Sequence, residues 1–237
     1  MLKVFDIVCT GGQYVLRRPD ATAAIYESTA ALAYELFFEI VRLAHPDLDP
    51  MACLHASLVR YGTGPVHSAV AFIANSGGGK STLAAALASA GWSILSDDRL
   101  FLDFPTCLPA ATPNTIGLKQ GSWAPLLSRY PAIAQLPIIR SEGREVRYLL
   151  PSPPTERLLP PVRHLFFPSY HAAAATTAIP LTTVQALERI AASESWISSD
   201  PGKLASFLQW TDGLGCYDLP YSSLDAAIEQ IEERLRA

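Results

Sequence analysis

The sequence predicts an α/β fold, in which helices pack on a sheet of buried strands. Strand-like and helix-like segments alternate along the chain from residue 51 onward. The run VAFIA at 70–74 is apolar at every position, as in a central strand that is covered on both faces. A final helical pattern at 223–236 carries one apolar stripe, made of Leu224, Ile228, Ile231 and Leu235.

Length and composition predict a folded chain that forms either one large domain or one domain with a small appendage. Of 237 residues, 49% are hydrophobic and only 17% are charged, which is enough to bury a sizeable core. The net charge is −4 and no cluster of Lys and Arg occurs, so we expect no nucleic-acid partner.

The cysteines and the apolar runs exclude two further classes of protein. Four scattered cysteines show neither the spacing of a zinc site nor that of a disulfide scaffold: Cys9, Cys53, Cys107 and Cys216. The chain begins without the apolar run of a signal peptide, and no segment approaches the ~20 apolar residues of a membrane span. We therefore expect a soluble, cytoplasmic protein with no membrane partner.

The first 50 residues predict a small α+β cap. Two short strands are expected at 2–9 and 13–17, around Gly11 and Gly12. A helix is expected at 28–44, where apolar residues fall on one face and Ser28 can cap the start. Residues 51–237 are then the main domain.

In the main domain, strand and helix signals follow one another up to residue 104. Strands are expected at 51–59, which carries His55, and at 67–74, 92–96 and 100–104. An alanine-rich helix is expected at 80–90, stopped by Gly91.

The second half begins with residues 105–144, which are rich in Pro, Gly and Ser and predict long ordered loops around a site. Beyond them, proline-terminated strands are expected at 146–150 and 164–167, helices at 182–192 and 201–211, a strand at 214–219 and the last helix at 223–236.

The segment ANSGGGKST at 74–82 predicts a phosphate-binding P-loop, because it follows a buried strand and opens a helix. Glycines allow the backbone N–H groups to approach phosphate, and the helix N-terminus adds partial positive charge. Lys80 can bridge the β- and γ-phosphates, and the Ser81 hydroxyl can bind Mg²⁺. The residues expected to bind ATP are Asn75, Ser76, Gly77, Gly78, Gly79, Lys80, Ser81 and Thr82.

Ala74 departs from the usual P-loop pattern, which has glycine six residues before the lysine. If the loop needs a positive φ at this position, alanine costs about 1 kcal/mol. The alternative interpretation of the whole segment is a glycine-rich turn between strand and helix with a chance lysine.

Asp97 and Asp98 end the apolar strand expected at 92–96, which comes directly after the P-loop helix. We expect this strand near the P-loop strand, so that both carboxyl ends open on the same rim of the sheet. One carboxylate can then hold Mg²⁺, and the other can accept the proton of an attacking hydroxyl. The alternative is a turn in which the aspartates cap backbone groups.

Together these motifs resemble the catalytic domain of HPr kinase/phosphorylase. The resemblance lies in LHA at 54–56, NSGGGKSTL at 75–83 and GWSILSDD at 91–98. It implies a P-loop kinase domain of the HPr kinase / PEP carboxykinase type that uses ATP and Mg²⁺ to phosphorylate a serine on a small protein. It also implies the possibility of a homo-oligomer.

The resemblance implies a role for each matching residue. Lys80 and Ser81 match the P-loop lysine and the magnesium-binding serine. Asp97 matches the aspartate proposed as base, and Asp98 matches its neighbour near the metal. His55 matches a histidine that orients that base, whereas without the resemblance it is more typical of a structural histidine.

Other segments depart from typical HPr kinases. The family signature has Glu and Arg followed by two glycines, and here Glu145 and Arg147 occur without the glycines. The N-terminal region is also short. The chain is similar instead to shorter HPr-kinase-related proteins, some of which phosphorylate lasso-peptide precursors, through the segments 116–123 and 144–148.

Lys119 and Arg147 are candidates for a phosphate clamp, because added cations stabilise the charge on a transferring phosphoryl group. The alternative for both is a solvated surface charge, and we expect Arg144 to be plain surface.

Three functions remain open at this point. The first is an ATP-dependent kinase that phosphorylates a hydroxyl on a peptide or small protein, of which a natural-product precursor is one candidate. The second is a kinase of a free metabolite, which a closed pocket formed by residues 105–144 would favour. The third is a nucleotide-binding regulatory module without chemistry.

Overall fold

The structure is a computed structural model that describes residues 6–18, 21–61, 68–112, 115–141, 143–150 and 159–236. The chain divides into two compact units, Met1–Asp47 and Leu48–Ala237, close to the boundary expected at residue 50. The beginning of the strand expected at 2–9 and the first residue of the strand expected at 67–74 lie outside the described residues.

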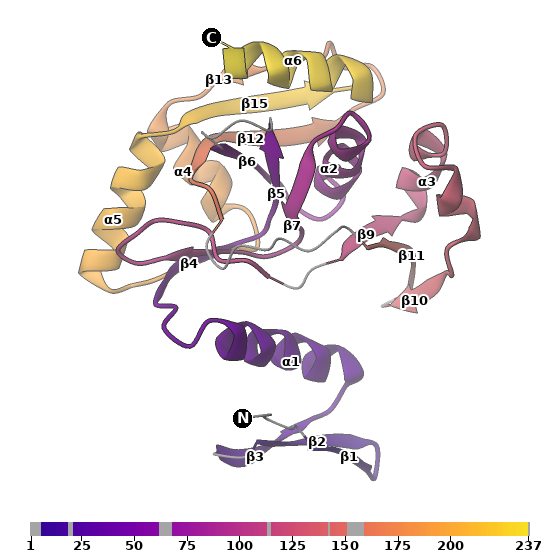
Figure 1. Ribbon diagram of the computed structural model, residues 1–237, viewed down its shortest axis with the longest axis vertical. Helices are drawn as coiled ribbons and strands as arrows, with labels where there is room; N and C mark the ends of the chain where they lie inside the picture. The colour runs from indigo at the N-terminus through magenta and orange to yellow at the C-terminus, as the bar shows by residue number, and fades with distance from the viewer. Residues whose placement is uncertain are drawn as a thin grey trace. The chain divides into compact units, whose positions relative to one another are not determined.

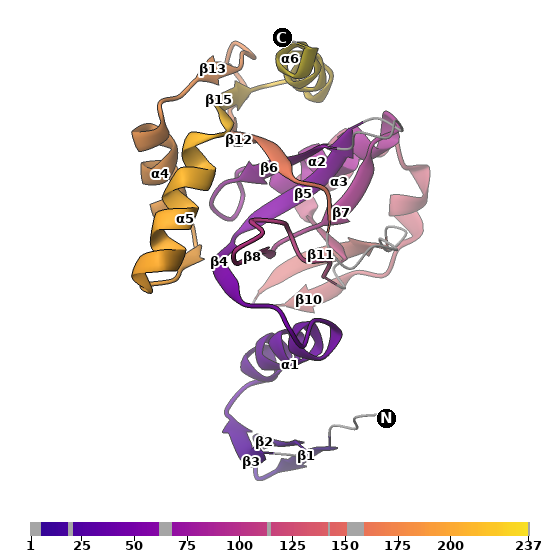
Figure 2. The ribbon, with the colours of Figure 1, turned by 60° about the vertical axis from the view of Figure 1, so that its left-hand side comes forward.

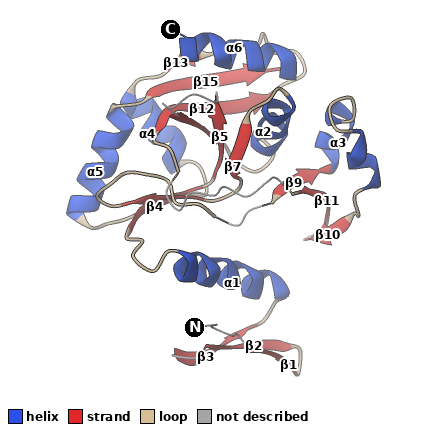
Figure 3. Ribbon diagram, viewed as in Figure 1, coloured by secondary structure: helices blue, strands red, loops and turns tan. Residues whose placement is uncertain are grey.

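The N-terminal unit is a three-stranded antiparallel sheet followed by a helix (Figure 3). Its elements are β1 (Asp6–Thr10), β2 (Gln13–Arg18), β3 (Ala21–Tyr26) and α1 (Thr29–Ala44). β3 is absent from the sequence-based expectation. The Ser28 hydroxyl caps α1 as expected, accepting a hydrogen bond from the N–H of Ala31 at 3.1 Å.

The second unit is built on a six-stranded sheet in the order β13-β15-β12-β6-β5-β7 (Figure 1). Its strands are β5 (Ala56–Tyr61), β6 (Ser68–Ile73), β7 (Ser93–Ser96), β12 (Val162–Tyr170), β13 (Ile179–Pro180) and β15 (Gly215–Tyr221). β12 runs parallel to β6 and β15, and β5 runs antiparallel to both β6 and β7. The strands β6, β7, β12 and β15 therefore point the same way, and their carboxyl ends share one rim.

Two smaller sheets complete this unit. One has the order β14-β4-β8, with β4 (Pro50–Leu54), β8 (Leu100–Asp103) and β14 (Trp196–Ile197). The other has the order β10-β11-β9, with β9 (Ile116–Lys119), β10 (Ile139–Ser141) and β11 (Arg144–Leu149). The helices are α2 (Lys80–Ser89), α3 (Gln120–Leu126), the 3-10 helix η1 (Pro131–Gln135), α4 (Thr183–Ala191), α5 (Pro201–Asp212) and α6 (Leu224–Arg236).

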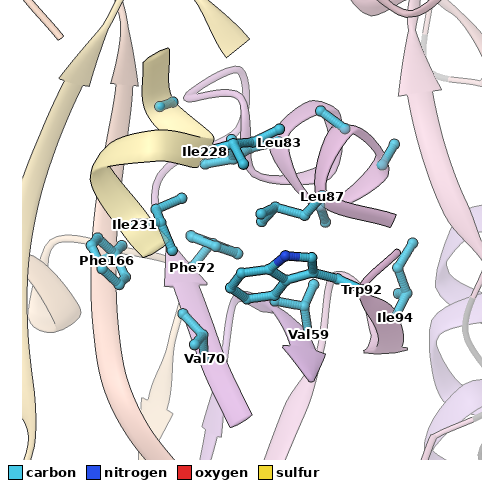
Figure 4. Packing of buried hydrophobic residues seen from close by; sticks show 14 of the residues in the cluster. Val59, Val70, Phe72, Leu83, Leu87, Trp92, Ile94, Phe166, Ile228 and Ile231 are labelled. Carbon is cyan, nitrogen blue, oxygen red and sulfur yellow. The ribbon is translucent and has the colours of Figure 1, made fainter. Parts of the chain in front are cut away.

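Two hydrophobic clusters cover the two faces of the large sheet, and β6 shows why. Val70 and Phe72 belong to the cluster under α2 and α6, whereas Ala69, Ala71 and Ile73 belong to the cluster under α4 and α5. Alternate residues of a strand point to opposite faces, so a strand covered on both sides is apolar throughout. Figure 4 shows the first cluster around Trp92, and Figure 2 shows α4 and α5 on the opposite side of the sheet from α2.

The strand expected at 51–59 is instead two strands in different sheets. β4 pairs with β8 and β14, and β5 pairs with β6 and β7. His55 is the residue between them. Because apolar residues continue across the break, the sequence pattern does not mark it.

The region at 105–144, expected to form long ordered loops, contains several regular elements in its described part. It contains β9, α3, η1 and β10, and begins β11. α3 and β9 pack against α2, so this region extends the hydrophobic core through Ile116, Leu118 and Leu126. β12 is also longer than expected and passes through Pro168. Beyond Phe166 it pairs with β15 alone, so the missing N–H of Pro168 falls where one side of the strand has no partner.

In the described part of the chain, no helix has both the length and the apolar character that crossing a membrane requires.

Candidate functional site

The P-loop joins the carboxyl end of β6 to the first turn of α2. Gly77 has φ 94° and Gly79, the residue before the helix, has φ 91°. A side chain is disfavoured in this left-handed region, so glycine is needed at both positions. At Gly79 space adds a second reason, because a Cβ there would lie 2.0 Å from the hydroxyl of Tyr221 at the end of β15.

Ala74 does not carry the backbone cost considered above. Within the described residues, the non-glycine residues with positive φ are Asp98 and Cys107. The alanine methyl group lies against Gly78, where an added Cβ would come within 2.7 Å of it. The methyl group of Ala74 therefore fits because Gly78 has no side chain.

Lys80 is buried, with 6% of its surface exposed, and its Nζ donates a hydrogen bond to the carbonyl oxygen of Ala74 at 2.6 Å. Burial lowers the pKa of Lys80 to about 8, and the nearby Asp97 partly opposes this shift. The ammonium is thus held across the loop that it would serve, and it is still mainly charged at neutral pH.

Asp97 lies at the carboxyl end of β7 and is almost fully buried, at 3% exposure. Its Oδ1 accepts a hydrogen bond from Ser81 Oγ at 3.1 Å and another from the Ser57 hydroxyl. Burial raises the pKa of Asp97, while the two hydroxyl groups act in the opposite direction. β7 does not lie beside β6, because β5 lies between them. Since β5 is antiparallel to both, β6 and β7 run in the same direction, and their carboxyl ends reach the same rim as expected.

Asp98 is in a different environment from its neighbour. Its φ is 72°, and the N–H of Arg99 donates to the carbonyl of Asp97 at 2.9 Å, which together describe a γ-turn of the strained, positive-φ kind. This turn leaves 67% of the Asp98 side chain exposed. Its Oδ1 lies 3.1 Å from His55 Nε2, and this hydrogen bond lowers the pKa of Asp98.

His55 therefore pairs with Asp98 and not with Asp97, which is where the resemblance placed it. The break between β4 and β5 puts the buried imidazole where β4 of one sheet ends and β5 of the other begins. Its backbone N–H donates to Ser195 Oγ at 3.0 Å, and its Nδ1 lies 3.8 Å from a carboxylate oxygen of Glu194. Ser57, Glu194 and Ser195 are site residues that the sequence did not indicate. For Ser57, the only signal was a polar residue within an apolar strand.

The positive side chains of the β10-β11-β9 sheet are arranged differently from the phosphate clamp that the sequence predicted. Lys119 Nζ lies 2.5 Å from the P-loop residue Ser76 at its Oγ, and Arg144 Nη1 lies 3.3 Å from the same oxygen. Arg147 instead stacks on the ring of Trp123 at 4.3 Å and donates to the carbonyl of Ile133. The structure thus brings Arg144 to the loop and directs Arg147 to packing.

Of the remaining P-loop residues, some are exposed to solvent and one packs against a neighbouring helix. Asn75, Ser76 and Gly77 are exposed. The Thr82 hydroxyl is 2.6 Å from Ser122 Oγ on α3, so its described contact holds α3 against α2 and does not face the loop.

These groups fit a magnesium–nucleotide complex. The loop has the two left-handed glycines that a backbone cradle for phosphate requires, and a buried lysine lies across it. Mg²⁺ prefers oxygen ligands and is usually held by one or two protein groups together with phosphates. The hydroxyl of Ser81 and the carboxylates of Asp97 and Asp98 supply that chemistry at the same rim.

Comparison with known proteins gives no match, since no protein-family model and no curated protein is similar to this chain at a significant level. The functional argument therefore depends on the geometry of the site.

Proposed function

We propose that this chain is an ATP-dependent kinase that transfers the γ-phosphate to a serine, or another hydroxyl, of a peptide or small protein. One observation carries the proposal. The P-loop hydroxyl that would bind Mg²⁺, Ser81 Oγ, donates a hydrogen bond to Asp97 at the end of β7, and the next carboxylate along the chain, Asp98, is hydrogen-bonded to His55. A phosphate loop, a metal ligand and a base are the parts that phosphoryl transfer needs.

ATP would be held by the loop at 75–82 and by Lys80, with Mg²⁺ near Ser81. The bound ion supplies neutralisation of the charge on the phosphates. Lys80 already lies across the loop, so the chain needs only to exchange the Ala74 carbonyl for phosphate oxygen as its partner.

The two aspartates have different surroundings, which supports a division of roles between them. Asp97 is buried against Ser81, so it suits the metal side. Asp98 is exposed, so an incoming hydroxyl can reach it, and the hydrogen bond from His55 keeps this carboxylate ionised and fixes its orientation. This assignment exchanges the roles that the resemblance to HPr kinases implies.

The exposure of Asp98 favours a peptide or protein substrate over a free metabolite. A metabolite kinase usually encloses its small substrate. Here the described part of 105–144 packs α3 onto α2, on the side of the sheet away from α4 and α5. Beside the His55 partner Ser195, the half-exposed Trp196 offers an apolar surface of the kind that peptide sites use.

The test is transfer of label from γ-labelled ATP, with Mg²⁺, to candidate peptides encoded beside the gene, followed by mass spectrometry. Wild type, Asp97→Asn and Asp98→Asn are compared over a range of Mg²⁺ concentrations. We expect Asp98→Asn to lower kcat by about 10²–10⁴-fold, the usual contribution of a general base, with the Mg²⁺ requirement unchanged. Asp97→Asn should instead raise the Mg²⁺ concentration that is needed for half-maximal rate.

The opposite pattern, in which Asp97→Asn lowers kcat and Asp98→Asn shifts the Mg²⁺ requirement, would restore the roles implied by the resemblance. Tight ATP binding without transfer to any peptide, in wild type, would contradict the kinase proposal and favour the regulatory module.

A further inference from the structure

The exposed P-loop residue Ser76 is contacted by two positive side chains from a sheet that is separate from the nucleotide loop. Lys119 Nζ is 2.5 Å from its Oγ and Arg144 Nη1 is 3.3 Å from it. A serine hydroxyl has two lone pairs, so it can accept both hydrogen bonds. It has no charge with which to balance two cations.

Strand register explains why these two residues meet. Lys119, at the end of β9, pairs with Val146 of β11. Arg144 lies two residues before Val146, and alternate residues of a strand share a face. Lys119 and Arg144 therefore project to the same side, whereas Glu145 and Arg147 project to the other. The contact with Ser76 is thus built into the pairing of β9 with β11.

The charges near this contact are unbalanced. Among the residues that the structure describes, neither Lys119 nor Arg144 forms an ion pair with a carboxylate. The charge of Lys119 also acts on Lys80, since it contributes to the lowered pKa of that residue. Lys119 and Arg144 therefore place two positive charges, without a carboxylate partner among the described residues, beside an exposed loop whose amide groups already favour an anion, whereas Asp97 and Asp98 act on the charge of Lys80.

We propose that Lys119 and Arg144 bind the terminal phosphoryl group of a nucleoside triphosphate and so make the site select triphosphate over diphosphate. P-loop amides bind the inner phosphates and the P-loop lysine bridges the β- and γ-phosphates, which leaves the other oxygens of the terminal group for cations that come from outside the loop. Arg is suited to this contact because its planar fork binds phosphate oxygens in pairs. This inference rests on the proposed nucleotide binding.

The experiment measures binding and needs no turnover. Isothermal titration calorimetry with Mg²⁺ compares ADP with the non-hydrolysable triphosphate AMP-PNP, for wild type, Lys119→Ala and Arg144→Ala. We expect each variant to lose about tenfold in affinity for AMP-PNP, as for one charged hydrogen bond, and to keep its ADP affinity within about twofold. Arg144→Lys should retain part of the preference because it keeps the charge.

Arg140→Ala is the matched control. This substitution removes the same charge from the same sheet. Arg140 is 83% exposed and pairs with Glu145, on the opposite face of the sheet from Lys119 and Arg144. It should leave both affinities unchanged, and unfolding curves should show that all variants are folded.

The two proposals fail in different ways. Equal losses for ADP and AMP-PNP in Arg144→Ala, or no loss for either, would overturn the role of the cation pair while nucleotide binding stands. No binding of either nucleotide by the wild type would overturn the proposed function, and this inference with it.

Discussion

At the scale of single residues, Asp97 and Asp98 are adjacent in the chain and have opposite electrostatic surroundings. Burial raises the pKa of Asp97, and the hydrogen bond from His55 lowers the pKa of Asp98. Environments that push the pKa values of two carboxyl groups apart are typical of sites in which the two groups have different roles. The difference arises from the backbone, because the γ-turn at Asp98 carries its side chain away from the buried position of Asp97.

The γ-turn makes a prediction about stability. Asp98→Ala and Asp98→Gly both lose the contact with His55, but only alanine keeps the strain of a side chain at φ 72°. We expect the Gly variant to be more stable than the Ala variant by about 1 kcal/mol in urea unfolding. At Glu229, an exposed position in α6, the same pair should show the reverse order by about 1 kcal/mol. Equal stabilities of the two Asp98 variants would contradict a strained turn.

Gly79 provides a second prediction at this scale. A methyl group added at Gly79 would be strained by the left-handed backbone and would also clash with the Tyr221 hydroxyl. At Gly77 the backbone is left-handed too, but no atom lies within contact distance of an added methyl group. Gly79→Ala should therefore destabilise the protein by at least about 1 kcal/mol more than Gly77→Ala. In thermal or urea unfolding, Tyr221→Phe should recover part of that difference, since it removes the nearest atom. Additive effects of the two substitutions would show that the hydroxyl is not the obstacle.

At the scale of elements, the long periodic segments were predictable and the short ones were not. α6 appears close to its expected bounds because it buries one stripe, and α2 because the glycine loop before it and Gly91 after it mark its ends. β6 appears because both of its faces are apolar. β13 and β14 have two residues each, too few to show a period, and they form only because longer strands supply their hydrogen-bond partners. Tertiary pairing, which local sequence does not show, decides such strands.

The same reasoning applies to the candidate site. The P-loop and the aspartate pair could be identified because their spacing along the chain is fixed by local geometry. The choice between Arg144 and Arg147 could not, because it depends on the register between β9 and β11. Likewise, the partner of His55 follows from a strand break that the apolar pattern hides.

Packing of α6 on the sheet yields a prediction for a whole element. Ile231 is fully buried in the cluster that includes Phe72 and Leu83 (Figure 4). Ile231→Ala should lower the free energy of unfolding by about 2–5 kcal/mol, because it leaves a cavity between helix and strands. Glu229→Ala on the exposed side of the same helix should change it by less than about 0.5 kcal/mol. Chemical denaturation of both variants measures the difference.

At the scale of the whole molecule, the two units have separate cores. Both large hydrophobic clusters are formed by residues from Met51 onward. The buried hydrophobic residues that the structure describes in the first unit, Leu16, Leu32 and Val41, belong to neither. All residues of the candidate site also lie in the second unit. The N-terminal unit is therefore not needed to form the site.

A truncated chain that begins at residue 48 should therefore fold and bind nucleotide. We expect a single cooperative unfolding transition and an affinity for Mg²⁺–AMP-PNP within about threefold of the full chain, which is less than 1 kcal/mol. Circular dichroism and calorimetry measure these properties. Loss of cooperative unfolding would show that the second unit depends on the first.

The chain passes from the sheet of β4 to the sheet of β5 at a single residue, and that residue is His55. Its own backbone belongs to neither ladder, and its N–H donates to Ser195 Oγ just before β14. A shift of β4 relative to β5 would therefore move the imidazole and change its distance to Asp98. A substitution that displaces β8 or β14, the two neighbours of β4, would thereby alter the surroundings of Asp98 without changing any residue of the loop at 75–82.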